Sequence, residues 1–130
     1  MERARARILV ADDEESIRFV LREALEAKGH LVSEVADGEA ALRALDDGEF
    51  DLAFLDIRMP GATGLEVLER AQTAPSETAV VIITAQSTFE NAVEAMKLGA
   101  LDYLTKPFSL AEVQALTDKA LRTRALELEV

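Results

Sequence analysis

The fold is decided by ten residues in the middle of the chain, Leu52-Ala53-Phe54-Leu55-Asp56-Ile57-Arg58-Met59-Pro60-Gly61. A run of four apolar residues ends on a carboxylate, and a Met-Pro-Gly turn signal follows almost at once. A short apolar run of this kind is typical of a strand that is buried on both faces of a parallel sheet. Asp56 would then lie at the carboxyl edge of that sheet, where open α/β folds place their functional groups.

Strand and helix signals alternate five times along the chain. Strands are expected at Arg7–Asp12, Leu31–Val35, Leu52–Asp56, Ala79–Thr84 and Asp102–Lys106. Helices are expected at about Glu15–Lys28, from Ala40 to near Gly48, over Leu65–Ala71, at Phe89–Leu98, and from Ser109 toward the C-terminus. Gly29 supplies a left-handed end for the first helix, and Ser109 with Glu112 has the pattern of a capping box. Right-handed crossovers then predict a doubly wound, flavodoxin-like (βα)5 fold of the α/β class, with a parallel sheet in the order 2-1-3-4-5.

Polar residues end four of these strands: Asp12, Asp13, Asp56, Thr84 and Lys106. In a parallel sheet they would converge on one cleft, where the carboxylates repel one another and raise at least one pKa. A hard divalent cation relieves that repulsion, and Mg²⁺ is the natural candidate. An aspartate can also act as a nucleophile that carries a phosphoryl group. An ammonium group and a hydroxyl in the same cleft would stabilise the charge of that group.

Composition limits the classes of function. The 130 residues are expected to form one domain, and a net charge of -11 argues against a nucleic-acid-binding face. The chain has no cysteine, which excludes disulfides and thiolate metal sites and fits a reducing compartment. Its basic N-terminus is not followed by a long apolar run, so neither a signal peptide nor a membrane span is expected. These features favour a cytoplasmic protein.

The chain resembles the receiver domains of two-component response regulators. The resemblance covers nearly all of the chain and rests on four segments: Val10-Ala11-Asp12-Asp13-Glu14, Asp56 to Gly61, Ile83-Thr84-Ala85 and Lys106-Pro107-Phe108. Two stretches are most similar to receivers of the NtrC type, found in activators of sigma-54 promoters: Thr84-Ala85-Gln86-Ser87 and Gly99 to Phe108. The resemblance implies that the domain accepts a phosphoryl group from a sensor histidine kinase, and that it is no enzyme beyond its own phosphotransfer and dephosphorylation.

The resemblance also assigns roles at the phosphorylation site. Asp56 would be the phospho-acceptor. Asp13 would bind Mg²⁺ directly, Asp12 mainly through water, and Asp56 and the backbone carbonyl of Arg58 would complete the protein's metal ligands. Lys106 would pair with the phosphoryl oxygens. Its bond to Pro107 would be cis, which aims the lysine at the cleft.

Two further residues would transmit the signal. Thr84 and Tyr103 are implied to switch a face made by helix four, strand five and helix five, which controls an output domain or downstream protein, with transcription regulation as the expected output. A change of self-association on phosphorylation is also expected. Its contacts would be Leu116, Leu121, Leu126 and Leu128. The segment 121–130 is either the end of helix five or a linker helix, so the chain is either a stand-alone receiver or part of a longer regulator.

Other interpretations of single residues remain open. Asp12 and Asp13 could cap the first helix. Glu14 is expected to be a first-turn acid favoured by the helix dipole. Tyr103 could serve packing alone or act as a switch, and neither interpretation is favoured. His30, which follows a glycine between two elements, is expected to be exposed and without chemistry.

Interpretations of the whole chain also remain open. Kinase docking is expected on helix one, where Ile17 opens the apolar stripe and Phe19 lies off it. The alternative to a receiver is a pseudo-receiver that only binds proteins. A hydrolase with an aspartyl-phosphate intermediate would usually have a second Asp two residues after the nucleophile, where this chain has Arg58.

Overall fold

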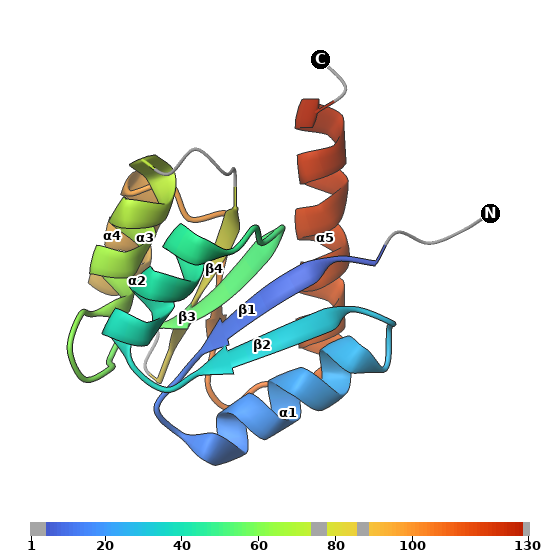
Figure 1. The fold of residues 1–130 in the computed structure, drawn as a ribbon, viewed down its shortest axis with the longest axis horizontal. Helices are drawn as coiled ribbons and strands as arrows, with labels where there is room; N and C mark the ends of the chain where they lie inside the picture. Colours follow the sequence, from blue (N-terminus) through green and yellow to red (C-terminus); the bar gives the residue numbers. More distant parts are fainter. Residues whose placement is uncertain (1–4, 74–77, 86–88, 129–130) are drawn as a thin grey trace.

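Figure 1 shows the computed structural model, which describes residues 5–73, 78–85 and 89–128. Five parallel strands form one sheet in the order β2-β1-β3-β4-β5, which confirms the predicted topology. The strands are β1 (Arg7–Ala11), β2 (Leu31–Val35), β3 (Leu52–Asp56), β4 (Ala79–Thr84) and β5 (Asp102–Thr105). The helices are α1 (Glu15–Glu26), α2 (Gly38–Asp47), α3 (Gly64–Thr73), α4 (Phe89–Lys97) and α5 (Leu110–Leu128).

Each face of the sheet is covered by its own layer of helices. Alternate residues of the central strands point to opposite faces, because successive side chains in a strand do so. Leu9, Ala53 and Ile82 pack with α2, α3 and α4, whereas Ile8, Phe54 and Ile83 pack with α1 and α5. The two layers lie on opposite sides of the sheet in Figure 1. Burial on both faces explains why the sequence of β3 is apolar throughout up to Asp56.

Strand register brings the polar strand ends to one edge. Ala11 of β1 is opposite Leu55 of β3, and Asp56 is opposite Ile83 of β4. Asp12 therefore follows β1 at the level of Asp56. Thr84 is opposite Thr105, and the amide of Lys106 donates to the Thr84 carbonyl at 2.8 Å. The predicted convergence of these strand ends at the carboxyl edge is confirmed.

Predicted element boundaries agree with the structure to within about two residues. Gly29 has a φ of 88°, the left-handed conformation expected after α1. The capping box of α5 is formed: the Ser109 amide donates to Glu112 Oε1 at 2.8 Å, and the Glu112 amide donates to Ser109 Oγ at 3.1 Å. These local signals depend on neighbouring residues alone, which is why the sequence predicts them well.

The prediction that His30 is exposed was wrong. The side chain is only 5% exposed, and its Nδ1 accepts a hydrogen bond from the Ala6 amide at 3.2 Å. Ala6 immediately precedes β1, so its buried amide needs a partner. His30 immediately precedes β2, the strand that pairs with β1, and its imidazole supplies that partner.

Two of the predicted dimer contacts are used within the domain. Leu116 and Leu121 are partly buried and pack against the core beneath α1 and α5. Their placement on α5 turns them toward the sheet, so they are poor candidates for contacts with a second molecule. The side chains of Leu126 and Leu128 lie outside the described residues. Across the described ranges, no helix is both long and apolar enough to cross a membrane.

Candidate functional site

Asp56 is the last residue of a strand that is buried along its whole length. The residue is 5% exposed, so its carboxylate has lost most of its hydration. Oδ1 accepts a long hydrogen bond of 3.4 Å from the Arg58 amide, and Oδ2 lies 3.4 Å from Lys106 Nζ. These contacts are too long to compensate fully for burial. The carboxylate is thus aimed at the cleft and only weakly bound.

Asp12 follows β1 and is fully buried. Its amide donates to the Val35 carbonyl at 3.2 Å, and its Oδ1 accepts from the Glu14 amide at 2.8 Å. Oδ2 is buried without a hydrogen-bond partner among the described residues, although Lys106 Nζ lies 3.0 Å away as an ion pair. Buried carboxylate oxygens normally have their acceptor capacity filled. Oδ2 therefore has capacity for a further electropositive partner.

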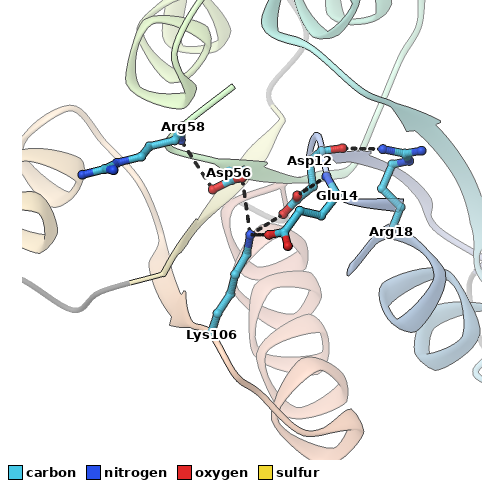
Figure 2. A network of polar contacts seen from close by, with 6 residues as sticks. All are labelled: Asp12, Glu14, Arg18, Asp56, Arg58 and Lys106. Carbon is cyan, nitrogen blue, oxygen red and sulfur yellow. Dashed lines mark hydrogen bonds and ion pairs between the residues drawn. The ribbon is translucent and has the colours of Figure 1, made fainter. Parts of the chain in front are cut away.

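Lys106 joins the carboxylates of the site, as Figure 2 shows. Its Nζ lies 2.8 Å from Glu14 Oε1, 3.0 Å from Asp12 Oδ2 and 3.4 Å from Asp56 Oδ2. The side chain is largely buried and reaches the cleft from the end of β5. The Lys106–Pro107 bond is cis, as the resemblance implied.

Burial and charge shift the acid–base properties of these groups. Burial, reinforced by the charge of Asp12, raises the pKa of Asp56 to about 6, while Lys106 opposes the shift. Burial likewise raises the pKa of Asp12, against the hydrogen bond from the Glu14 amide and the contacts of Lys106. Burial lowers the pKa of Lys106, but bonds to Glu14 and Asp12 and the charges of Asp12 and Asp56 outweigh it, so this pKa lies above its usual value.

Three of the carboxylates fit a divalent cation. Oxygens of Asp12, Asp13 and Asp56 all lie within 4.8 Å of one another. Carboxylate oxygen is the ligand type that Mg²⁺ prefers, and Mg²⁺ commonly keeps several waters in its shell. The spacing suits a cation that some carboxylates contact directly and others through water. Asp12 Oδ2, which is buried beside Lys106 Nζ without a hydrogen bond among the described residues, supports the same conclusion.

A pocket of about 300 Å³ opens beside these groups. Its lining includes the predicted residues Asp13, Asp56, Arg58 and Lys106. Thr84 is buried at the end of β4 and is not among the described residues that line this pocket. Tyr103 is exposed on the edge strand β5, away from the lining. The structure therefore brings the acids and the lysine together. The two predicted switch residues, Thr84 and Tyr103, lie outside the described lining of the pocket.

Sequence reasoning missed several contributors. Glu14 is the N-cap position of α1 but makes no side-chain cap bond, and it pairs with Lys106 instead of acting only on the helix dipole. Asp12 Oδ1 accepts from the Glu14 amide in the loop that leads into α1, a role close to the capping alternative. Asn91 of α4 also lines the pocket. The position of Glu14 directly after the acidic pair was the signal that could have identified it.

Gly64 makes room for the backbone of Asp56. A Cβ atom at Gly64 would lie 2.2 Å from the Asp56 carbonyl oxygen, far inside van der Waals contact. The Gly64 amide also donates to the Ile57 carbonyl at 2.9 Å. The first residue of α3 is thus packed directly against the end of β3, a close approach that needs glycine.

Residues 8–118 match the protein-family model described as "Response regulator receiver domain". The chain belongs to the response regulator receiver family. A solved receiver domain supports the assignment: the Francisella response regulator 1452 receiver domain is 32% identical, covers 91% of this chain and 98% of that chain, and has a TM-score of 0.82. NtrX from Brucella abortus is 36% identical with a TM-score of 0.89, over 97% of this chain and 29% of that chain.

Curated relatives include transcriptional regulators. The receiver domain is 38% identical over 122 residues to the uncharacterized transcriptional regulatory protein YkoG of Bacillus subtilis, covering 94% of this chain and 54% of that protein. It is 37% identical over 118 residues to the DNA-binding transcriptional regulator NtrC of Azospirillum brasilense, covering 91% of this chain and 24% of that protein. The chain thus spans about half, or less, of these relatives, and the similarity to NtrC-type receivers is confirmed.

Proposed function

We propose that this receiver domain accepts a phosphoryl group on Asp56 from a sensor histidine kinase. The observation that carries the proposal is the Asp56 carboxylate, weakly bound at a strand end and 3.4 Å from the Lys106 ammonium, in a pocket that Asp13 also lines. Family membership supports the same assignment. Residues 1–130 act as one receiver unit in the cytoplasm under this proposal.

The transfer is a displacement at phosphorus. One carboxylate oxygen of Asp56 forms the new O–P bond, while the P–N bond of the phosphohistidine breaks and its electron pair returns to the imidazole. Lys106 Nζ, already 3.4 Å from Asp56 Oδ2, pairs with an oxygen of the transferred group. Phosphoryl transfer depends mainly on such positioning and charge stabilisation. The Thr84 hydroxyl donates a further hydrogen bond to the phosphoryl oxygens under this proposal.

Asp12, Asp13, Asp56 and the backbone carbonyl of Arg58 would hold Mg²⁺. When bound, Mg²⁺ would neutralise the repelling carboxylates and the charge on the phosphoryl oxygens. Asp13 is exposed and lines the pocket, so it is the proposed direct ligand. Asp12 is fully buried and paired with Lys106, so it would act mainly through water.

The output is proposed to be a change in the face formed by α4, β5 and α5. Phosphorylation would draw Thr84 toward the pocket and allow Tyr103 to move inward, a population shift between two packings. Each of these elements exposes a large apolar side chain: Met96 on α4, Tyr103 on β5 and Leu110 on α5. An output domain or downstream protein would read this face. Transcription regulation is the proposed outcome, because several relatives are named as transcriptional regulators.

Incubation with acetyl phosphate and Mg²⁺, followed by intact-protein mass spectrometry, tests the proposal. We expect a phosphoryl adduct that EDTA prevents. The absence of an adduct, with no consumption of acetyl phosphate, would favour a pseudo-receiver. Rapid hydrolysis of acetyl phosphate without an adduct would favour a hydrolase.

A further inference from the structure

The peptide between Asp12 and Asp13 is held from outside the pocket by Arg18. Arg18 extends from α1, and its Nη1 donates to the Asp12 carbonyl oxygen at 2.7 Å (Figure 2). The same guanidinium donates through Nε to Glu34 Oε1 on β2 at 3.2 Å. One guanidinium group therefore connects α1 and β2 to the loop that carries the acidic pair.

Glu34 fixes the orientation of Arg18. Its second carboxylate oxygen, Oε2, accepts a hydrogen bond from Arg22 Nη1, one turn further along α1. The Arg18 and Glu34 side chains are 17% and 24% exposed, so solvent competes only weakly for these bonds. The guanidinium is planar and its donors have fixed directions. Binding of Nε by Glu34 thus determines where Nη1 points.

Arg18 acts on the geometry of the loop. Among the described residues its hydrogen bonds are with the Asp12 carbonyl and Glu34, not with a carboxylate of the acidic cluster. The amide of Asp12 is held by the sheet through Val35, and the Asp12 side chain is held by the Glu14 amide. The Asp12 carbonyl belongs to the same peptide unit as the Asp13 amide, so it sets the direction in which Asp13 leaves the strand end.

We propose that Arg18, oriented by Glu34, is a positioning residue that aims Asp13 into the pocket and so sets the affinity of the cluster for Mg²⁺. The inference rests on the proposed metal role of Asp13. Without Arg18 the peptide gains rotational freedom, and the exposed Asp13 carboxylate spends time directed away from Asp12 and Asp56. Groups that orient metal ligands typically change metal affinity by 10–100-fold when removed.

Magnesium titration by calorimetry tests the inference on four proteins: wild type, Arg18→Ala, Glu34→Ala and the double variant. We expect Arg18→Ala to weaken Mg²⁺ binding about tenfold. Glu34→Ala should weaken it less, because Arg18 can still reach the carbonyl. The double variant should match Arg18→Ala, since both residues act through one hydrogen bond and their effects should not add.

Arg70→Ala is the matched control. It removes another arginine–carboxylate pair, with Asp46, that joins α2 to α3 away from the pocket. Its Mg²⁺ affinity should equal that of the wild type, and a thermal melt of each variant separates loss of stability from loss of affinity. If Arg18→Ala does not fold, Arg18→Met takes its place, because it removes every donor of the guanidinium while keeping an unbranched side chain that can pack.

Wild-type Mg²⁺ affinity in folded Arg18→Ala, or in Arg18→Met where that variant replaces it, would overturn the inference and leave the proposed metal site standing. Strictly additive losses in the double variant would overturn the role of Glu34 in orienting Arg18. A wild type that binds no Mg²⁺ would overturn the metal site itself, and the inference with it.

Discussion

At the scale of single residues, the site holds acids close together at an energetic cost. Asp12 and Asp56 are both buried, and one ammonium, Lys106, contacts both. Burial, with the charge of Asp12, raises the pKa of Asp56 to about 6. A raised pKa of this kind is typical of functional sites, where the group that later binds a cation or phosphoryl group is destabilised beforehand. The ionised Asp56 carboxylate should therefore lower the stability of the metal-free protein.

The cost of burying the ionised Asp56 carboxylate predicts that the wild type and Asp56→Asn differ in stability toward unfolding, and that this difference depends on pH. A carboxyl group with a raised pKa favours folding while it is protonated. Its contribution to the stability of the wild type is therefore complete below about pH 3.8 and is lost as the pH rises through about 6. In EDTA, Asp56→Asn should therefore gain stability relative to the wild type as pH rises across this window. The gain should reach up to about 3 kcal/mol near neutral pH.

Urea unfolding of both proteins in EDTA, at about pH 4.5 and about pH 7.5, measures this difference. Saturating Mg²⁺ should reduce it at the higher pH, because the cation binds the folded wild type. A stability difference that is the same at both pH values would contradict the account of Asp56.

Single residues also mark the limit of prediction from sequence. The convergence of Asp12, Asp56 and Lys106 could be predicted, because parallel strands that end in polar residues share one edge. The partnership of Arg18 with the Asp12 carbonyl could not, because a long side chain on a helix can reach many partners. The burial of His30 was mispredicted because it depends on a hydrogen bond from the amide of Ala6, which is distant in sequence.

At the scale of elements, α1 supports the site through Arg18 and is also the helix on which kinase docking is predicted. Phe19 on this helix is 51% exposed, with the Arg22 guanidinium 5.7 Å from the centre of its ring. Ile17 is partly buried against the core, so substituting it would disturb packing as well as docking. Phe19 is therefore the cleaner residue for testing the proposed contact between α1 and the kinase.

We predict that Phe19→Ala slows phosphotransfer from the cognate histidine kinase about tenfold, the loss typical of an aromatic residue central to an interface. Labelling by acetyl phosphate should be unchanged, because Phe19 lies outside the pocket. Leu31→Ala is the matched control, since Leu31 is also 51% exposed. Leu31 begins β2, so it lies at the amino ends of the strands, whereas the pocket lies at their carboxyl ends. Equal phosphotransfer rates in the wild type and Phe19→Ala would rule out docking through this residue.

Helix and strand boundaries were predictable for a different reason from the site. Capping residues and apolar periodicity act over a few neighbouring residues, so the start of α5 at its capping box could be placed from sequence. The inward direction of Leu116 and Leu121 depends on how α5 packs against α1 and the sheet, which local patterns do not define.

At the scale of the whole molecule, the two helical layers leave β5 as an edge strand between α4 and α5. The exposed apolar side chains of Met96, Tyr103 and Leu110 belong to these three elements. They replace Leu116 and Leu121 as candidates for contacts with a second molecule. A phosphoryl group on Asp56 would change this face only if it stabilises one of the two packings of α4, β5 and α5 more than the other.

We predict that beryllofluoride, a mimic of the phosphoryl group on Asp56, changes the self-association of the domain. Sedimentation velocity with and without the mimic measures the change, and Asp56→Asn is the control that should not respond. Thr84→Ala should respond weakly, because it lacks the hydroxyl proposed to transmit the signal. An unchanged oligomeric state in the wild type would remove the dimer from the proposal, and a full response in Thr84→Ala would remove Thr84.

The central claim is that Asp56 alone carries the phosphoryl group. Borohydride reduces an acyl phosphate to an alcohol, so treatment of the acetyl phosphate-labelled protein converts a phosphorylated aspartate to homoserine, which peptide mass mapping locates. The account predicts homoserine at position 56, dependent on Mg²⁺, with Asp12 and Asp13 unmodified. Homoserine at either of those positions, or none at position 56 in a protein that carries the phosphoryl adduct, would contradict it.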